Sequence, residues 1–229
     1  MGKNSRFKYD VDIVFCIDAT MSMYPILDEI KNRAILFYQD FKNEMDAKGK
    51  KVGSLRIRIV AFRDYFYDQE EAMLETDFFE LPQMAETFEQ VIKSIEPNGG
   101  GDDPEDGLEA LYYAMKSDWF TGPAKKRHVI VVWTDSGTHP LGFGKSVDAY
   151  PAKMAQDFNE LSSMWGNSYE PGVMDQSAKR LLLFAPDEPG WTNIRNSGWD
   201  NVIHVVTDQG MGLRDKEYNE ILDVITNSI

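Results

Sequence analysis

One carboxylate and two hydroxyls follow the first apolar segment of the chain, at every second position. They are Asp18, Thr20 and Ser22, and the apolar residues 11–17 precede them. That segment is short and rich in β-branched residues, which predicts a buried parallel strand. Open α/β sheets bind their ligands in the loops at the carboxyl ends of the strands. Three oxygen donors in such a loop favour a hard cation such as Mg2+, although Thr20 or Ser22 could instead cap the helix that begins near Pro25.

Two later loops carry more acids. Residues 98–106 place three glycines beside four acids, and glycine lets the backbone approach an ion closely. The acids of this loop could approach an ion, although Asp102 or Asp103 could instead cap the next helix. Asp135 follows the apolar residues 128–133 and could also be a turn residue. All these loops leave the same edge of the predicted sheet, so we expect their acids to lie beside Asp18.

The elements that must position these loops alternate along the whole chain. Mostly parallel strands with helices on both faces follow from this alternation. We predict an α/β fold, a Rossmann-like three-layer αβα sandwich whose one antiparallel strand, at residues 72–81, lies at an edge. The remaining strands are predicted at residues 11–17, 55–62, 128–133, 181–184 and 202–206, and the helices are predicted to begin near Pro25, Pro82, Pro104, Pro151 and Arg214.

The composition narrows the class of protein. With 229 residues, 42% of them hydrophobic, the chain can bury a core of its own, and we expect a single domain over residues 1–229. A net charge of −14 argues against nucleic acid as a partner. No stretch approaches the roughly 18 apolar residues of a membrane span, and the polar residues 1–10 predict no secretory signal. Cys16 is the single cysteine, which favours the cytoplasm and an inert core position.

Together, these loops resemble the metal-ion-dependent adhesion site, or MIDAS, of von Willebrand factor type A (vWA) domains. That family carries an Asp-x-Ser-x-Ser motif after its first strand, a threonine in a second loop and an aspartate after a later strand. The resemblance covers nearly the whole chain. It implies a vWA-like sandwich and a divalent cation held by the five residues in the matching positions: Asp18, Thr20, Ser22, Asp102 and Asp135.

Two of these positions depart from the family pattern. Thr20 replaces the usual serine but keeps the hydroxyl, whereas Asp102 replaces the usual threonine and adds a negative charge. In the family, few direct ligands are anionic, so an acidic residue of a partner can complete the coordination of the metal. An extra carboxylate should tighten metal binding and weaken that attraction. Residues 62–65 and 99–106 are similar to a narrower branch of vWA domains, attached to or encoded beside alpha-type protein kinases.

The resemblance implies a non-enzymatic protein-binding module that uses Mg2+, or Mn2+ or Ca2+ in its place. One alternative is a metal-dependent phosphohydrolase on a Rossmann-like sheet, similar to the haloacid-dehalogenase-like enzymes. Those enzymes need a second aspartate two residues after the first as general acid, and Thr20 stands there. Another alternative is a scaffold whose site stays empty. Asp64 follows the second strand and could be a neighbour of the metal site, with a turn or a salt bridge as the alternatives. His139 could line the same rim, but we expect it to be an exposed loop residue, as single histidines in loops usually are.

Overall fold

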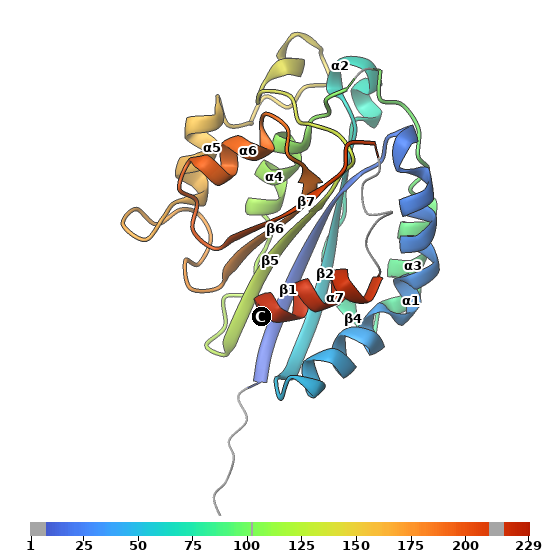
Figure 1. Ribbon diagram of the computed structural model, residues 1–229, viewed down its shortest axis with the longest axis vertical. Coiled ribbons are helices and arrows are strands. Elements are labelled where there is room, and N and C mark those ends of the chain that lie inside the picture. The colour runs from blue at the N-terminus through green and yellow to red at the C-terminus, as the bar shows by residue number, and fades with distance from the viewer. Residues whose placement is uncertain (1–7, 102, 211–217) are drawn as a thin grey trace, which may run out of the picture.

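A seven-stranded sheet forms the centre of the computed structural model, which describes residues 8–101, 103–210 and 218–229 (Figure 1). The strand order is β3-β2-β1-β5-β6-β7, and β4 also pairs with β2. Five strands are mutually parallel, as predicted: β1 (Lys8–Asp18), β2 (Lys51–Phe62), β5 (Lys125–Trp133), β6 (Lys179–Pro186) and β7 (Val202–Thr207). β1 therefore lies in the middle of the sheet, between β2 and β5.

The antiparallel edge is confirmed, but it is divided into two short strands. β3 (Met73–Glu75) and β4 (Phe79–Leu81) both pair antiparallel with β2. Thr76 lies between them and binds β2 through its side chain, since the amide of Ile59 donates to Thr76 Oγ1 at 3.0 Å. The acidic segment 72–81 thus follows β2 without forming one continuous ladder.

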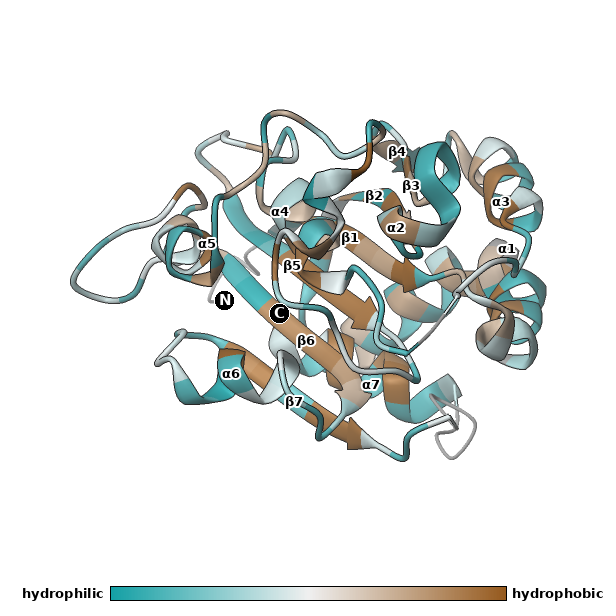
Figure 2. Ribbon diagram, turned by 90° about the horizontal axis from the view of Figure 1, so that it is seen from above, coloured by the Kyte–Doolittle hydropathy of each residue, from teal (hydrophilic) through white to brown (hydrophobic). Residues whose placement is uncertain are grey.

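Helices cover both faces of the sheet, because the side chains of each strand alternate between the two faces. In β1, Ile13 and Phe15 face one apolar core, while Val14 and Cys16 face the other. The first core is closed by α1 (Tyr24–Ala47), α3 (Ala85–Ser94) and α7 (Tyr218–Ser228), and the second by α4 (Gly107–Met115), α5 (Phe158–Trp165) and α6 (Trp191–Asn196). Figure 2 looks onto the carboxyl ends of the strands, which lie as a hydrophobic layer between these helices.

Three helices begin later than predicted. α3 begins at Ala85 rather than at Pro82, because residues 82–84 form a turn. α4 begins at Gly107 rather than at Pro104, because Glu105 is extended and forms a parallel bridge with Thr138. α5 begins at Phe158 rather than near Pro151, because Asp157 caps it and accepts from the amides of the second and third residues beyond it. The predicted start of the last helix, Arg214, falls outside the described residues.

Short helical turns, which the sequence analysis did not predict, fill the loops above the carboxyl edge. They are η1 (Met21–Met23), α2 (Tyr65–Asp68), η2 (Gln69–Glu71) and η3 (Phe143–Ser146). Each has only three or four residues, too few to show the periodicity that identifies a longer helix. They matter because α2 and η1 carry or adjoin the candidate site residues.

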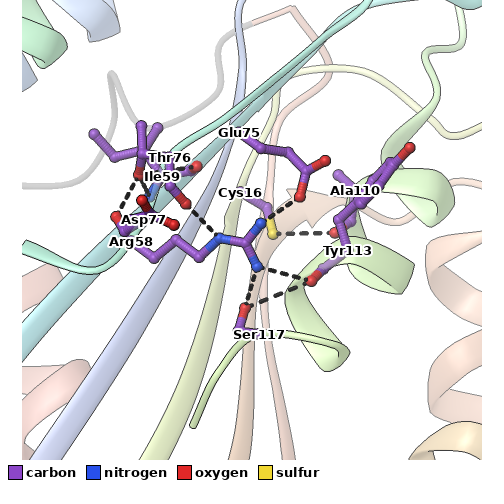
Figure 3. Close-up of polar contacts among 9 residues, drawn as sticks. All are labelled: Cys16, Arg58, Ile59, Glu75, Thr76, Asp77, Ala110, Tyr113 and Ser117. Carbon is purple, nitrogen blue, oxygen red and sulfur yellow. Dashed lines mark hydrogen bonds and ion pairs between the residues drawn. The ribbon is translucent and has the colours of Figure 1, made fainter.

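Arg58 joins the antiparallel edge to α4 (Figure 3). Its guanidinium donates to the carbonyl of Thr76 at 2.7 Å and to Ser117 Oγ at 2.6 Å, and it forms an ion pair with Glu75. Cys16 is fully buried nearby, and its thiol contacts the carbonyl of Ala110. Burial raises the pKa of the Cys16 thiol well above its usual range, so this cysteine is an inert core residue, as predicted.

Across the described residues, no helix has both the length and the apolar character needed to cross a membrane.

Candidate metal centre

The first loop folds its hydroxyls back onto its own carboxylate. Asp18 ends β1 and is completely buried. Its Oδ1 accepts hydrogen bonds from the amide of Thr20 at 2.9 Å and from Thr20 Oγ1 at 2.6 Å. Thr20 Oγ1 in turn lies 3.2 Å from Ser22 Oγ. The spacing of two residues therefore brings all three donors of this loop into one row.

The loop after β5 completes this row, since β5 lies beside β1 in the sheet. Ser22 Oγ donates to Asp135 Oδ1 at 2.8 Å, and Thr134 Oγ1 donates to the second oxygen of Asp18 at 2.6 Å. Four of the five predicted ligands, Asp18, Thr20, Ser22 and Asp135, are thus brought together at the carboxyl edge of the sheet. Asp102, the fifth, lies outside the described residues.

These donors fit a hard divalent cation in type and in spacing. Successive oxygens of the row lie 2.6–3.2 Å apart. Neighbouring ligands of an octahedral Mg2+ ion, with bonds of about 2.1 Å, lie about 3.0 Å from one another. Carboxylate and hydroxyl oxygens also suit Mg2+, Mn2+ or Ca2+ better than the metals that prefer thiolates.

The electrostatics of the row favour a cation as well. Burial, assisted by the nearby Asp135 carboxylate, raises the pKa of Asp18 to about 6. Hydrogen bonds from Thr134 and Thr20 act in the opposite direction and lower the pKa. Two buried carboxylates therefore share this edge, and a bound dication would relieve their mutual repulsion.

A cleft of about 410 Å³ opens beside the row. The glycine-rich loop forms one wall, and Gly100 has a positive φ of 75° and lies against Thr20 and Glu105. Asp103, one of the two possible helix caps, does not cap α4. It lies on the rim, where it accepts from Ser136 Oγ and from Gln209 Nε2, the latter at 2.8 Å.

Glu105 also lines this cleft and was missed as a candidate. Its side chain is only 3% exposed, and its Oε2 has no hydrogen-bond partner among the described residues. Burial, together with the nearby carboxylates of Asp18 and Asp64, raises the pKa of Glu105 to about 10. In the sequence, this residue had been grouped with the acids of a loop, and nothing in the local pattern predicted its burial.

A second polar cluster lies at the same edge and consists of Asp64, Asp106 and His139, all buried. His139 Nε2 lies 2.9 Å from Asp64 Oδ2, so the two side chains are in direct polar contact. The prediction that His139 is exposed is wrong, because its ring stacks on Phe143 at 3.8 Å between centroids. Asp64 follows a parallel strand, as Asp18 and Asp135 do, and this is the signal in the sequence that it lies near the first loop.

Over 141 residues the chain is 24% identical to an alpha-protein kinase, vwkA, from Dictyostelium discoideum, a match that covers 62% of this chain and 21% of that protein. This chain thus spans about a fifth of the length of that curated relative. No protein-family model matches the chain.

Two solved structures are also similar. The pilus adhesin SpaC from Lactobacillus rhamnosus GG has a TM-score of 0.50 at 10% identity, over 96% of this chain and 30% of that one. The vWF domain of the type V pili tip protein Mfa5 from Porphyromonas gingivalis is 24% identical over 57% of this chain and 39% of that one, with a TM-score of 0.36. The chain resembles vWA domains, with a vWA-like α/β sandwich and a mostly parallel sheet.

Proposed function

We propose that this chain is a non-enzymatic protein-binding module whose binding depends on a divalent cation. The observation that supports this most strongly is the row of oxygens from Asp18, Thr20, Ser22 and Asp135 at the carboxyl edge of a vWA-like sheet. We propose these four and Asp102 as the ligands of a MIDAS-type centre. Mg2+ is the proposed ion, with Mn2+ or Ca2+ in its place under other conditions.

The cleft gives a partner access to the proposed ion. Mg2+ takes six oxygen ligands and usually keeps several waters, which a partner's group can displace. Ser22 is exposed, and Met21, 57% exposed, lines the same cleft. An acidic side chain of a protein partner would complete the coordination, while Met21 would supply an apolar contact beside it.

The phosphohydrolase alternative has less support. Such an enzyme would carry an acid at position 20 to protonate the leaving group. Thr20 stands there, and its hydroxyl is engaged with the Asp18 carboxylate. We also propose a cytoplasmic location, which the single, buried Cys16 supports.

Calorimetric titration with Mg2+ tests the metal centre directly. The wild type should bind Mg2+, and Asp18→Ala should lose most of this binding. Asp46→Ala is the matched control, since Asp46 is an exposed aspartate near the far end of α1. Equal Mg2+ binding by wild type and Asp18→Ala, with both proteins folded, would contradict the proposal.

Acetate serves as a simple probe for the partner's acidic group. In the Mn2+-loaded protein, acetate should displace metal-bound water and lower the water-proton relaxation rate. Asp102→Thr removes one anionic ligand, so it should weaken Mn2+ binding while increasing the response to acetate at full metal occupancy. A response unchanged by Asp102→Thr would remove Asp102 from the ligand set.

A chelator-sensitive interaction with a cellular protein would complete the test of the module. Immobilised wild-type chain should retain that protein in Mg2+ and release it in chelator, and Asp18→Ala should not retain it. Phosphatase turnover that is lost in Asp18→Ala would favour the enzyme alternative instead.

A further inference from the structure

Backbone hydrogen bonds fasten three loop segments together beside the row of oxygens. The amide of Asp106 donates to the carbonyl of Arg63 at 3.1 Å, and the amide of Tyr65 donates to Asp106 Oδ2 at 2.7 Å. The amide of His139 donates to the carbonyl of Glu105 at 2.8 Å. The loops after β2 and β5 are thereby held against the segment that precedes α4, and this arrangement fixes the position of their side chains.

We propose that Asp64, Asp106 and His139 form a second divalent-cation site, separate from the Asp18 centre, that takes a transition-metal ion such as Zn2+ or Mn2+. Each residue offers one ligand atom, and these atoms all lie within 4.8 Å of one another. With metal–ligand bonds of about 2.1 Å, adjacent octahedral ligands lie about 3.0 Å apart and opposite ones about 4.2 Å. The 2.9 Å between His139 Nε2 and Asp64 Oδ2 matches an adjacent pair.

The charges around the cluster are an independent reason to place a dication there. Glu105 carries a buried oxygen, Oε2, without a hydrogen-bond partner among the described residues, and it interacts electrostatically with Asp64 and Asp106. The Arg63 guanidinium, adjacent in sequence, points away from the acids, since it donates to the carbonyls of Ala19, Glu71 and Glu96. A divalent metal ion would supply two positive charges to the carboxylates of Asp64 and Asp106.

The donor set selects a different metal from the first centre. Imidazole nitrogen suits Zn2+ and other transition metals, while Mg2+ and Ca2+ prefer oxygen alone. The row around Asp18 offers only oxygens, whereas this cluster offers His139 Nε2. Glu105 lines the cleft of the first centre and interacts with Asp18 as well as with Asp64.

The Asp64–His139 contact could alternatively be an ion pair that needs no metal. Electron spin-echo spectroscopy of Mn2+-loaded protein separates the two interpretations, because an imidazole ligand adds a nitrogen modulation to the metal signal. We expect two Mn2+ ions per chain and a nitrogen modulation. Asp18→Ala should retain the modulation while losing one ion. A wild type that is folded but shows no nitrogen modulation, and binds no Zn2+ by calorimetry, would overturn the proposal.

Two variants identify the ligands. His139→Gln should abolish the modulation and weaken Zn2+ binding by more than the roughly 10–100-fold typical of losing an outer-shell partner. Asp106→Asn keeps the size of the side chain and should weaken Zn2+ binding in the same way, so it replaces His139→Gln if that variant fails to fold. His204→Gln is the matched control, because His204 is a half-buried histidine whose Nε2 contacts the carbonyl of Ala185.

The same experiment distinguishes this proposal from the first. Loss of Mg2+ binding in Asp18→Ala together with an unchanged Zn2+ affinity in His139→Gln would leave the MIDAS-type centre standing and refute the second site. Zn2+ binding that depends on His139, in a chain that binds no Mg2+, would do the reverse.

Discussion

Replacing Asp18 by asparagine should stabilise the metal-free protein and abolish its response to Mg2+. Asp18 is completely buried, and burial raises the pKa of its carboxyl from 3.8 to about 6. The folded protein therefore holds this proton more tightly than the unfolded chain does. The metal-free protein therefore loses stability as the pH rises through the window from about 4 to 6. At pH 7 the carboxyl is ionised in both states, and the whole free-energy cost of burying its charge lowers the stability.

The size of the effect follows from the shift. A pKa raised from 3.8 to about 6 corresponds to about 3 kcal/mol of folding free energy at pH 7. Asparagine removes this net cost, but both oxygens of Asp18 accept hydrogen bonds and the NH2 group of asparagine cannot, so one of these bonds is lost at a cost of about 1–2 kcal/mol. The net gain of about 1–2 kcal/mol should raise the melting temperature by about 2–8 °C for a chain of this length.

Thermal melting with and without Mg2+ measures both parts of the prediction. At a Mg2+ concentration 100 times the dissociation constant, the wild type should gain about 2.7 kcal/mol, or about 5–11 °C. Asp18→Asn should start higher in chelator and gain nothing from Mg2+. A lower melting temperature for Asp18→Asn in chelator would refute the electrostatic reasoning, and a retained Mg2+ response would refute the role of Asp18 as a ligand.

Three further predictions concern the surroundings of the site and the scaffold. Gly100→Ala should weaken Mg2+ binding measured by calorimetry, because the added Cβ would lie 2.9 Å from Glu105 Oε1. Gly49→Ala is the control: Gly49 has a similar positive φ but open space around it, so this variant should cost about 1–2 kcal/mol of stability and leave Mg2+ binding unchanged. Asp12→Ala should lower the free energy of unfolding in urea by about 3–5 kcal/mol, because it leaves Arg56 without its buried partner; little change would contradict this. Burial lowers the pKa of Lys179 to about 8, so the unfolded chain binds more protons than the folded one between pH 8 and 10.5. The free energy of unfolding of the wild type should therefore rise over that range relative to that of Lys179→Met, and a stability difference that does not change with pH would contradict the shift.

The fold could be predicted because its strands are continuous apolar segments of the length that buried parallel strands require. Residues 11–17 and 128–133 are apolar on both faces of a strand, so they can be buried only in the middle of a sheet that helices cover on both sides. β1 and β5 lie there. The boundaries that were wrong have tertiary causes. Pro104 is a favourable first helical residue by its local chemistry, but the pairing of Glu105 with Thr138 keeps that segment extended.

The candidate site could be predicted only in part, because some of its residues are brought together by tertiary contacts that no local motif shows. Asp18, Thr20 and Ser22 form a local motif, and their geometry is set within five residues. The proximity of Asp64, Asp106 and His139 depends on contacts between loops that are far apart in sequence. A single histidine in a loop carries no local sign that it will be buried, so His139 was placed in solvent. The ligand role of Asp102 remains a prediction, because that residue lies outside the described part of the chain.

The position of the acids in the sheet explains why one edge could serve two ions. The chain crosses from β1 through α1 to β2 on one side, and from β5 through α5 to β6 on the other. Loops that leave neighbouring strands in opposite directions open a crevice between them, and Asp18 and Asp135 lie there. Asp64 follows β2, the next strand along, and its carboxylate is also buried. Buried acids cost folding free energy unless a counter-charge is present. A chain that places three such acids after adjacent strands is therefore destabilised without cations, and its stability should depend on them more than its core packing alone would predict.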